Sequence, residues 1–223
     1  MLIFVMRAYL PTFYPSRIVN VTFLMEFDME QELFDTLTAL EMQDQQERAN
    51  GLPREERLRA LHPDSAKLLF NLAVSNKAKT IVEIGTRAGY STLWLAYAAS
   101  ITGGKVITCE IDPVYAEQAR TNLAQAHMSE YVEILVGDAR ELLRGRDEPI
   151  DFVFIDAEKA QYESYIDAVY KQLGVGSMVV ADNAVSHDDE LLDYIMYVQN
   201  HPNLESVTVP IAKGMEITVK LTA

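Results

Sequence analysis

A strand, a glycine turn and a helix follow one another over residues 80–99, and this stretch constrains the fold more than any other. Residues 80–84 form a short apolar, β-branched run that predicts a buried strand. Gly85 and Gly89 come next, and residues 91–99 predict a helix. Glycines at such a turn let the backbone bend sharply and approach a ligand closely. The arrangement is typical of α/β proteins that bind nucleotides.

The spacing of this turn indicates which ligand it suits. Dinucleotide sites use G-x-G-x-x-G, whose backbone amides hold a pyrophosphate. Here the pattern is Glu83-x-Gly85-x-x-x-Gly89, with a carboxylate near the end of the strand. That carboxylate would repel a diphosphate but would attract an ammonium or sulfonium group, such as those of S-adenosylmethionine (SAM). Taken alone, the turn is a weak signal, and an ordinary strand-to-helix turn stays open as an alternative.

Strands and helices alternate along the rest of the chain. Further strands are predicted at residues 106–110, 133–136, 151–156, 177–182, 206–211 and 216–221. The loop between the last two is too short for a crossover, so they form an antiparallel hairpin. We therefore expect an α/β fold with a Rossmann-like, doubly wound, mostly parallel seven-stranded sheet and a C-terminal antiparallel hairpin.

Capping residues set the expected limits of the helices. Asp28 is expected to cap a first helix that Gly51 ends. His62 is expected to cap or precede a second helix, and Asp112-Pro113 to begin a third. Later helices are predicted at residues 160–173 and 190–199, the last one capped by Asp188 or Asp189.

Length suits one domain, which we place at residues 28–223. Residues 1–27 are apolar but interrupted by prolines, and they do not read as a signal peptide. Two alternatives stay open for them: an N-terminal arm, or a start-codon artefact with Met25 or Met29 as the true beginning.

Composition excludes several classes of function. The formal net charge of −14 disfavours a nucleic-acid partner, which would need basic residues against its phosphates. No apolar run reaches the length of a membrane span. The single cysteine, Cys109, lies in a predicted strand and fits a reducing compartment, so we expect a cytoplasmic protein with a buried, inert thiol.

Acidic residues stand where three successive strands end. In a parallel sheet, ligands bind beyond these carboxyl ends. Glu110, about 20 residues past the glycine turn, is placed to accept hydrogen bonds from ribose hydroxyls. Asp138-Ala139 is placed for an adenine amino group. Together with Glu83, these residues predict an adenosine ligand.

Two further strand ends carry a different chemistry. Asp156 ends one strand, and Asp182-Asn183 ends the next. Carboxylate and amide oxygens suit a hard divalent ion, above all Mg²⁺, whereas zinc would need Cys or His ligands. The alternative is that the two aspartates cap the following helices, although capping would not explain Asn183.

Three motifs in this order resemble the metal-dependent class I O-methyltransferases, which include catechol and caffeoyl-CoA O-methyltransferases. They are the glycine turn of residues 83–91, Phe-Ile-Asp-Ala-Glu-Lys at 154–159, and Asp182-Asn183. The resemblance covers residues 64–221. It implies a homodimer that binds SAM and a small hydroxylated molecule. It also implies a metal held by Asp156, Asp182 and Asn183.

The resemblance further assigns roles to individual residues. Lys159 would be the general base, and Glu216 a weaker candidate beside the substrate hydroxyls. The cofactor site would include Glu83, Gly85, Gly89, Ser91, Glu110, Asp138, Ala139 and Asp156. A phenol has a pKa near 10, which a divalent metal lowers, and a nearby lysine can then take the proton. The structural alternative for Lys159 is a surface lysine in a first helical turn.

The sequence departs from the resembled pattern at two loops. Lys213-Gly214 stands where many relatives carry Asp-Gly, and only four residues separate Asn183 from the next helix. The short loop predicts an open acceptor pocket and disfavours caffeoyl-CoA. We expect a SAM- and metal-dependent O-methyltransferase acting on a catechol-like vicinal diol. Alternatives are an amine or natural-product hydroxyl as acceptor, or a non-catalytic SAM- or nucleotide-binding protein. A dehydrogenase is disfavoured because the third glycine is missing.

Overall fold

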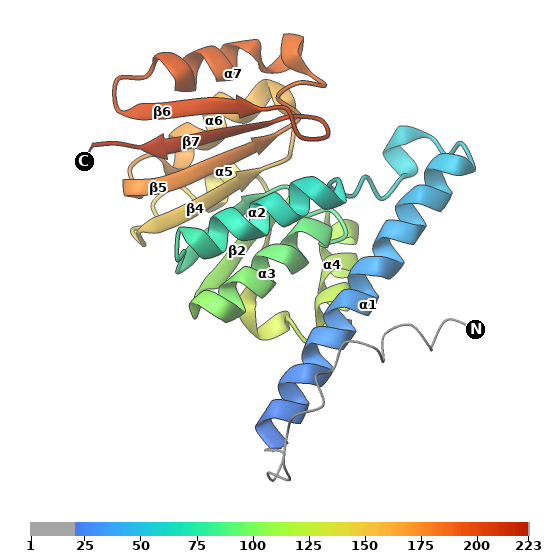
Figure 1. Cartoon of the computed structure of the whole chain (residues 1–223). Helices are drawn as coiled ribbons and strands as arrows, with labels where there is room; N and C mark the ends of the chain where they lie inside the picture. Colours follow the sequence, from blue (N-terminus) through green and yellow to red (C-terminus); the bar gives the residue numbers. More distant parts are fainter. Residues whose placement is uncertain (1–20, 223) are drawn as a thin grey trace.

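A single sheet with helices on both faces forms the body of the protein (Figure 1). The computed structural model describes residues 21–222, and seven strands lie within that range. They are β1 (Thr80–Ile84), β2 (Lys105–Glu110), β3 (Val132–Val136), β4 (Ile150–Ile155), β5 (Leu173–Asp182), β6 (Leu204–Val209) and β7 (Met215–Lys220). Their order is β3-β2-β1-β4-β5-β7-β6; the first five are parallel, and β7 is antiparallel to both neighbours. The predicted fold class is therefore confirmed.

Helices connect these strands and cover the sheet. The α-helices are α1 (Val21–Ala49), α2 (Pro63–Ser75), α3 (Tyr90–Thr102), α4 (Pro113–Gln125), α5 (Ala139–Leu142), α6 (Tyr162–Val169) and α7 (Asp188–Asn200). Short 3₁₀ helices are η2 (Arg54–Glu56), η3 (Ser129–Tyr131) and η4 (Lys159–Gln161). Within residues 21–222, no helix combines the length and the apolar character that a membrane span requires.

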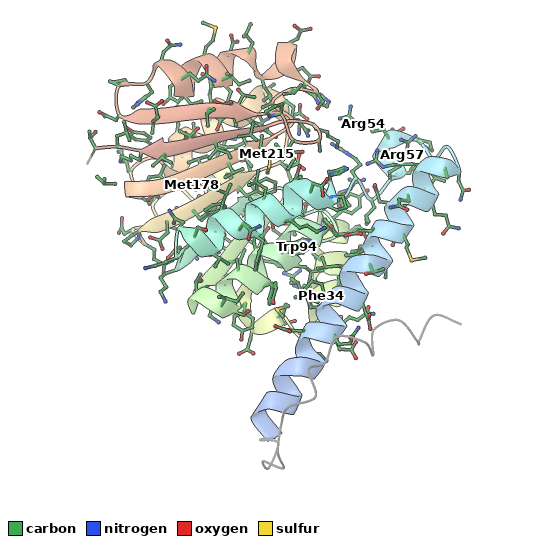
Figure 2. The ribbon with its side chains drawn as sticks, viewed as in Figure 1. Phe34, Arg54, Arg57, Trp94, Met178 and Met215 are labelled. Atoms are coloured by element: carbon green, nitrogen blue, oxygen red, sulfur yellow. The ribbon has the colours of Figure 1, made fainter. Side chains whose placement is uncertain are left out.

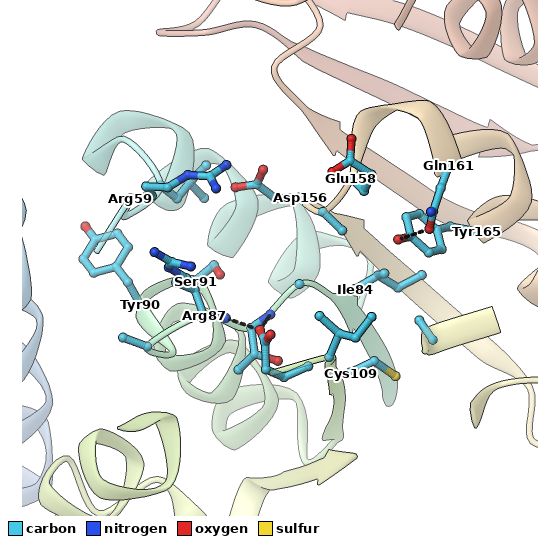
Figure 3. Close-up of a pocket in the computed structure, with 18 of the residues that line it drawn as sticks. Arg59, Ile84, Arg87, Tyr90, Ser91, Cys109, Asp156, Glu158, Gln161 and Tyr165 are labelled. Carbon is cyan, nitrogen blue, oxygen red and sulfur yellow. Dashed lines mark hydrogen bonds between the residues drawn. The ribbon is translucent and has the colours of Figure 1, made fainter. Parts of the chain in front are cut away.

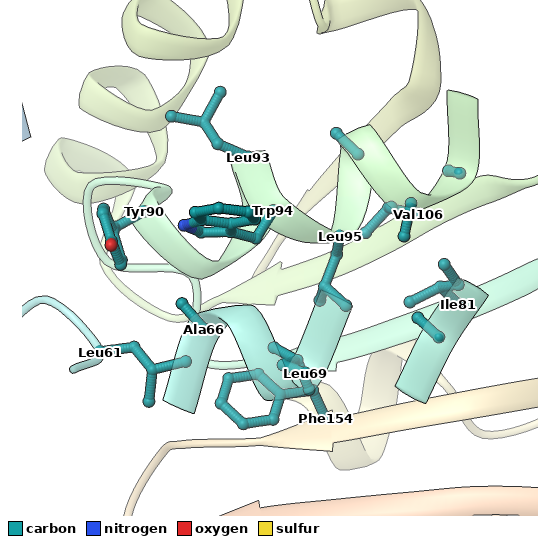
Figure 4. Close-up of a cluster of buried hydrophobic side chains, with 14 of the residues drawn as sticks. Leu61, Ala66, Leu69, Ile81, Tyr90, Leu93, Trp94, Leu95, Val106 and Phe154 are labelled. Carbon is teal, nitrogen blue, oxygen red and sulfur yellow. The ribbon is translucent and has the colours of Figure 1, made fainter. Parts of the chain in front are cut away.

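The two faces of the sheet have separate cores because strand side chains alternate. On β4, Phe152 and Phe154 face the core that includes α2 and α3, whereas Val153 and Ile155 face the core that includes α6 and α7. Figure 4 shows part of the first core, where Leu69 of α2 lies between Leu95 of α3 and Phe154 of β4. The sheet is thus anchored from both sides, which fixes where its strand ends lie.

Two of the expected caps are confirmed. Nδ1 of His62 accepts a hydrogen bond from the backbone N–H of Asp64 at 3.2 Å, so His62 caps α2. Asp112 caps α4 by accepting from the N–H of Val114 at 2.8 Å. Both helices have proline in their first turn, where a missing N–H costs nothing.

Other predicted limits are wrong. The first helix begins at Val21, so Asp28 lies inside α1 and is not its N-cap; the apolar and acidic residues on either side continue the helix. The N-cap position of α7 is His187, not Asp188 or Asp189. The predicted helix 160–173 stops at Val169 and β5 begins at Leu173, because pairing with β4 extends that strand. The predicted arm of residues 1–27 lies mostly outside the described residues.

Candidate active site

A cavity of about 430 Å³ opens beyond the carboxyl ends of β1, β2 and β4, where the strand order reverses between β1 and β4. This is the position at which doubly wound sheets bind ligands. Six of the predicted cofactor residues line it (Figure 3): Gly85, Ser91, Glu110, Asp138, Ala139 and Asp156. The structure therefore brings residues that follow or end β1, β2, β3 and β4, and residues of α3 and α5, to a single cavity.

The backbone at position 85 lies so close to the backbone of Asp156 that only glycine fits there. Its φ of +99° lies in the left-handed region, and a Cβ at this position would lie 2.3 Å from the carbonyl oxygen of Asp156. Gly89 is the N-cap of α3, also with a positive φ of 87°. The first glycine thus brings the turn against the end of β4, and the second starts the helix.

Glu83 lies behind the cavity and does not line it. Its side chain is fully buried and accepts hydrogen bonds from Ser91 Oγ (2.5 Å), Thr92 Oγ1 (2.5 Å) and Thr108 Oγ1 (2.7 Å). Burial raises the pKa of Glu83 to about 7. The carboxylate ties the first turn of α3 to β1 and β2. Glu83 is linked to the cavity only through its hydrogen bond with Ser91, which lines the cavity.

Glu110 supports the same turn from β2. Its carboxylate accepts from the backbone N–H groups of Thr86 (3.1 Å), Arg87 (2.7 Å) and Asp112 (2.9 Å). Its two oxygens offer about four lone-pair positions, so one acceptor position remains for a ligand hydroxyl.

Asp138 and Cys109 complete this side of the cavity. Asp138 caps α5 through the N–H of Arg140 at 2.9 Å, and the hydrogen bonds from the Arg140 side chain hold the pKa of Asp138 below its usual value. Cys109 is buried, and burial raises the pKa of its thiol to about 12. The thiol therefore stays protonated, as expected of an inert cysteine.

The segment between α1 and α2, residues 50–62, forms one wall of the cavity; we call it the connector. Leu58, Arg59, Ala60 and Leu61 line the cavity from it. Arg87 holds the connector, since its Nη2 donates to the carbonyl oxygens of Glu55 (2.7 Å) and Arg57 (2.6 Å). The guanidinium also stacks 3.6 Å above the ring of Tyr115. No signal in the sequence places these residues at the cavity.

The proposed metal ligands lie at the neighbouring ends of β4 and β5. Asp182 and Asn183 are buried, and Asn183 Nδ2 donates to Asp182 Oδ2. Asp182 Oδ1 is buried with no hydrogen-bond partner. Burial, and secondarily the charge of Asp156, raises the pKa of Asp182 to about 7. An unpartnered carboxylate oxygen beside a second carboxylate fits a bound divalent cation.

The proposed ligands Asp156, Asp182 and Asn183 include only two carboxylates, and the third ligand is an amide. Over residues 21–222, no group of three or more His, Cys, Asp or Glu side chains could hold a metal ion. Two carboxylates and an amide would leave several positions for water or substrate oxygens, which Mg²⁺ tolerates.

Lys159 lies beside these carboxylates, in η4. It is buried, and its Nζ donates to Asp156 Oδ1 (2.9 Å), the carbonyl oxygen of Ala157 (3.0 Å) and the hydroxyl of Tyr162 (3.1 Å). It is therefore not a surface lysine. Two tyrosines of α6 lie close by: Tyr162 contacts the lysine, and Tyr165 lines the cavity.

Glu216 does not join this group, which corrects its assignment as a substrate residue. It pairs with Ala181, whereas Asp182 pairs with Met215, so Glu216 and Asp182 face opposite sides of the sheet. Its buried carboxylate accepts from Gln199 Nε2 (2.9 Å), Ser206 Oγ (2.6 Å) and Thr208 Oγ1 (2.5 Å). Glu216 therefore joins α7 to the terminal hairpin.

Comparisons with known proteins agree with this geometry. Residues 56–221 match the family described as O-methyltransferase. A catechol O-methyltransferase of Niastella koreensis is 38% identical over 138 residues, which cover 60% of this chain and 62% of that protein. A catechol O-methyltransferase of Mycobacterium tuberculosis is 39% identical over 127 residues, which cover 56% of this chain and 57% of that protein. The matched region therefore spans less than two thirds of either relative.

A solved structure gives the same fold. The O-methyltransferase TomG from Streptomyces achromogenes, involved in tomaymycin synthesis and solved in complex with SAM, is 29% identical. The match covers 82% of this chain and 89% of that one, with a TM-score of 0.69. Fold and cavity together define a Rossmann-like α/β protein with a ligand cavity where its strand order reverses. More particularly, the chain belongs to the O-methyltransferase family, because that family's match covers most of its length.

Proposed function

We propose that this protein is a SAM-dependent O-methyltransferase that methylates one hydroxyl of a small catechol-like vicinal diol with the help of a divalent metal. The observation that carries the proposal is the unpartnered buried oxygen of Asp182, at the strand end next to that of Asp156, which lines the cavity. The two relatives named as catechol O-methyltransferases support the acceptor, and the relative solved with SAM supports the donor.

The proposed site has two parts, one that binds SAM and one that binds the metal ion. SAM, which supplies a methyl group on a sulfonium, would occupy the cavity between Gly85, Ser91 and Glu110, with Asp156 facing its amino group. Glu83 and Gly89 would keep the turn in shape behind it. Asp156, Asp182 and Asn183 would hold Mg²⁺ or another divalent cation, which lowers the pKa of a hydroxyl that it coordinates.

We assign Lys159 as the general base. Its amine is buried beside the strand ends and can accept the hydroxyl proton once it has lost its own. Holding acceptor and donor in line would supply much of the rate.

Chelation tests the proposal directly. Methylation of catechol with labelled SAM should stop with EDTA and return with excess Mg²⁺, and Asp182→Ala should lower kcat/KM by at least about a hundredfold. Full activity after chelation would remove the metal from the mechanism.

A second acceptor class, a natural-product hydroxyl, is favoured by the relative involved in tomaymycin synthesis, and a panel of acceptors separates the two.

We also propose a cytoplasmic homodimer in which residues 28–223 form one domain. Phe34 and Met42 of α1 are exposed, which leaves apolar surface for a second copy. Light scattering should give twice the chain mass of 25.1 kDa. A monomer at micromolar concentration would contradict this part of the proposal.

A further inference from the structure

Arg59 is a positively charged residue of the cavity wall to which the proposed function gives no role. It belongs to the connector and lines the same cavity as Asp156. In Figure 3 its side chain extends from the connector toward that of Asp156. Among the described residues, none of the four carboxylates that line the cavity forms an ion pair with Arg59 within 4.0 Å. The guanidinium is therefore available to an anionic group of a ligand in the cavity.

The backbone on either side of Arg59 is anchored to α1. The N–H of Leu58 donates to Glu47 Oε2 at 2.5 Å, and the N–H of Ala60 donates to Asp44 Oδ1 at 3.2 Å. Between these anchors Arg59 has a φ of +56°, in the left-handed region that residues with a side chain seldom adopt. Such a conformation persists only where the surrounding contacts impose it. The two anchors thus fix the direction in which the Arg59 side chain leaves the connector.

A second guanidinium lies close enough to Arg59 to sense its charge. Burial lowers the pKa of Arg87, and the positive charge of Arg59 lowers it further, against the opposing effects of Tyr115, Glu110 and Asp112. Arg87 already donates through Nη2 to two carbonyl oxygens of the connector. A carboxylate bound to Arg59 would reduce the repulsion between the two guanidinium groups.

The glycine turn is a poor site for such a carboxylate. In dinucleotide sites the N–H groups of this turn hold the anion. Here two of them donate to the carboxylate of Glu110, and those of Gly85 and Gly89 donate to backbone carbonyl oxygens. Glu110 also brings a negative charge to the turn. An anionic group of the ligand must therefore be bound by another part of the cavity wall.

The methionyl end of SAM carries an ammonium and a carboxylate on the same carbon atom. We propose that Arg59 binds this carboxylate while Asp156 faces the ammonium, so that the two side chains recognise the amino-acid end of the donor as a pair. A guanidinium suits this role because two of its N–H groups match the two oxygens of a carboxylate. The inference rests on the proposed function and adds to it a residue that selects the donor.

Calorimetry with SAM and decarboxylated SAM tests the inference without turnover. The two ligands share the adenosine, the sulfonium and the ammonium, and only SAM has the carboxylate. The wild type should bind SAM more tightly. Arg59→Gln should reduce that preference about tenfold by weakening SAM alone, and Arg59→Lys, which keeps the charge but not the paired donors, should reduce it less. Both variants should unfold at the wild-type temperature, because Arg59 is exposed.

Arg54→Gln is the matched control. Arg54 lies in the same connector (Figure 2), carries the same charge and is exposed, but it does not line the cavity. Its removal should leave both affinities unchanged. Equal weakening of the two ligands in Arg59→Gln, or no weakening of either, would overturn the inference and leave the proposed function standing. A wild type that binds neither ligand would overturn both.

Discussion

At the scale of single residues, Glu83 organises the ligand-binding turn without touching the cavity. Three hydroxyl groups donate to its carboxylate, and one of them belongs to Ser91, which lines the cavity. A buried carboxylate with these neutral donors remains costly to ionise. Its pKa of about 7, against an ordinary value of 4.5, makes that cost measurable.

Glu83 should make stability depend on pH. Because the folded state holds the proton more tightly, its contribution is full below pH 4.5 and is lost as pH rises to about 7. The free energy of unfolding of the ligand-free wild type should therefore fall by about 3 kcal/mol relative to Glu83→Gln across that window. Urea unfolding at several pH values measures the difference. Exposed Glu205→Gln is the control, and parallel curves for wild type and Glu83→Gln would contradict this account.

Gly85 should tolerate no side chain. Gly85→Ala places a methyl against the Asp156 carbonyl, and should weaken SAM binding at least about tenfold and destabilise the fold. Gly176→Ala is the matched control, because its φ of +86° carries the same backbone cost, about 1 kcal/mol, with no atom within 4 Å. Calorimetry with SAM separates them, and equal SAM affinity in the two variants would show that the close approach is unimportant.

At the scale of elements, the connector joins the two subsites. It lines the cavity through Leu58 and Arg59 and contacts His187, in the loop after the proposed metal ligand Asn183, through Arg54. Few of its own residues are buried, and hydrogen bonds to Arg87, Tyr115 and the α1 carboxylates of Asp44 and Glu47 help to hold it. Such a segment is expected to open locally more easily than the sheet beneath it.

Loss of the Arg87 contacts should loosen the connector. Arg87→Lys keeps the charge but cannot reproduce the two hydrogen bonds and the stacking on Tyr115. SAM affinity should fall about tenfold, and amide exchange of residues 52–61 should speed up while β1 stays protected. Exposed Arg144→Lys provides the comparison. Unchanged exchange in the connector would mean that other contacts hold it.

At the scale of the whole molecule, the sheet and the position of its main cavity could be predicted because parallel strands end at one edge. Asp156 and Asp182, far apart in sequence, were placed together for that reason alone. The face of Glu216 could not be predicted, since a shift of one residue in the hairpin register reverses it. The contact of the connector with Arg87 escaped prediction because Arg87 bonds backbone carbonyls, which leave no sequence pattern.

The account depends most on a divalent cation at the ends of β4 and β5. The direct measurement is binding of Mn²⁺, followed by electron paramagnetic resonance of the free ion, with no substrate turnover involved. We predict saturation at one ion per chain in the wild type and in Glu216→Gln, whose carboxylate faces the other side of the sheet. Asp182→Ala should lose this binding. Equal Mn²⁺ affinity in Asp182→Ala and wild type would contradict the central claim.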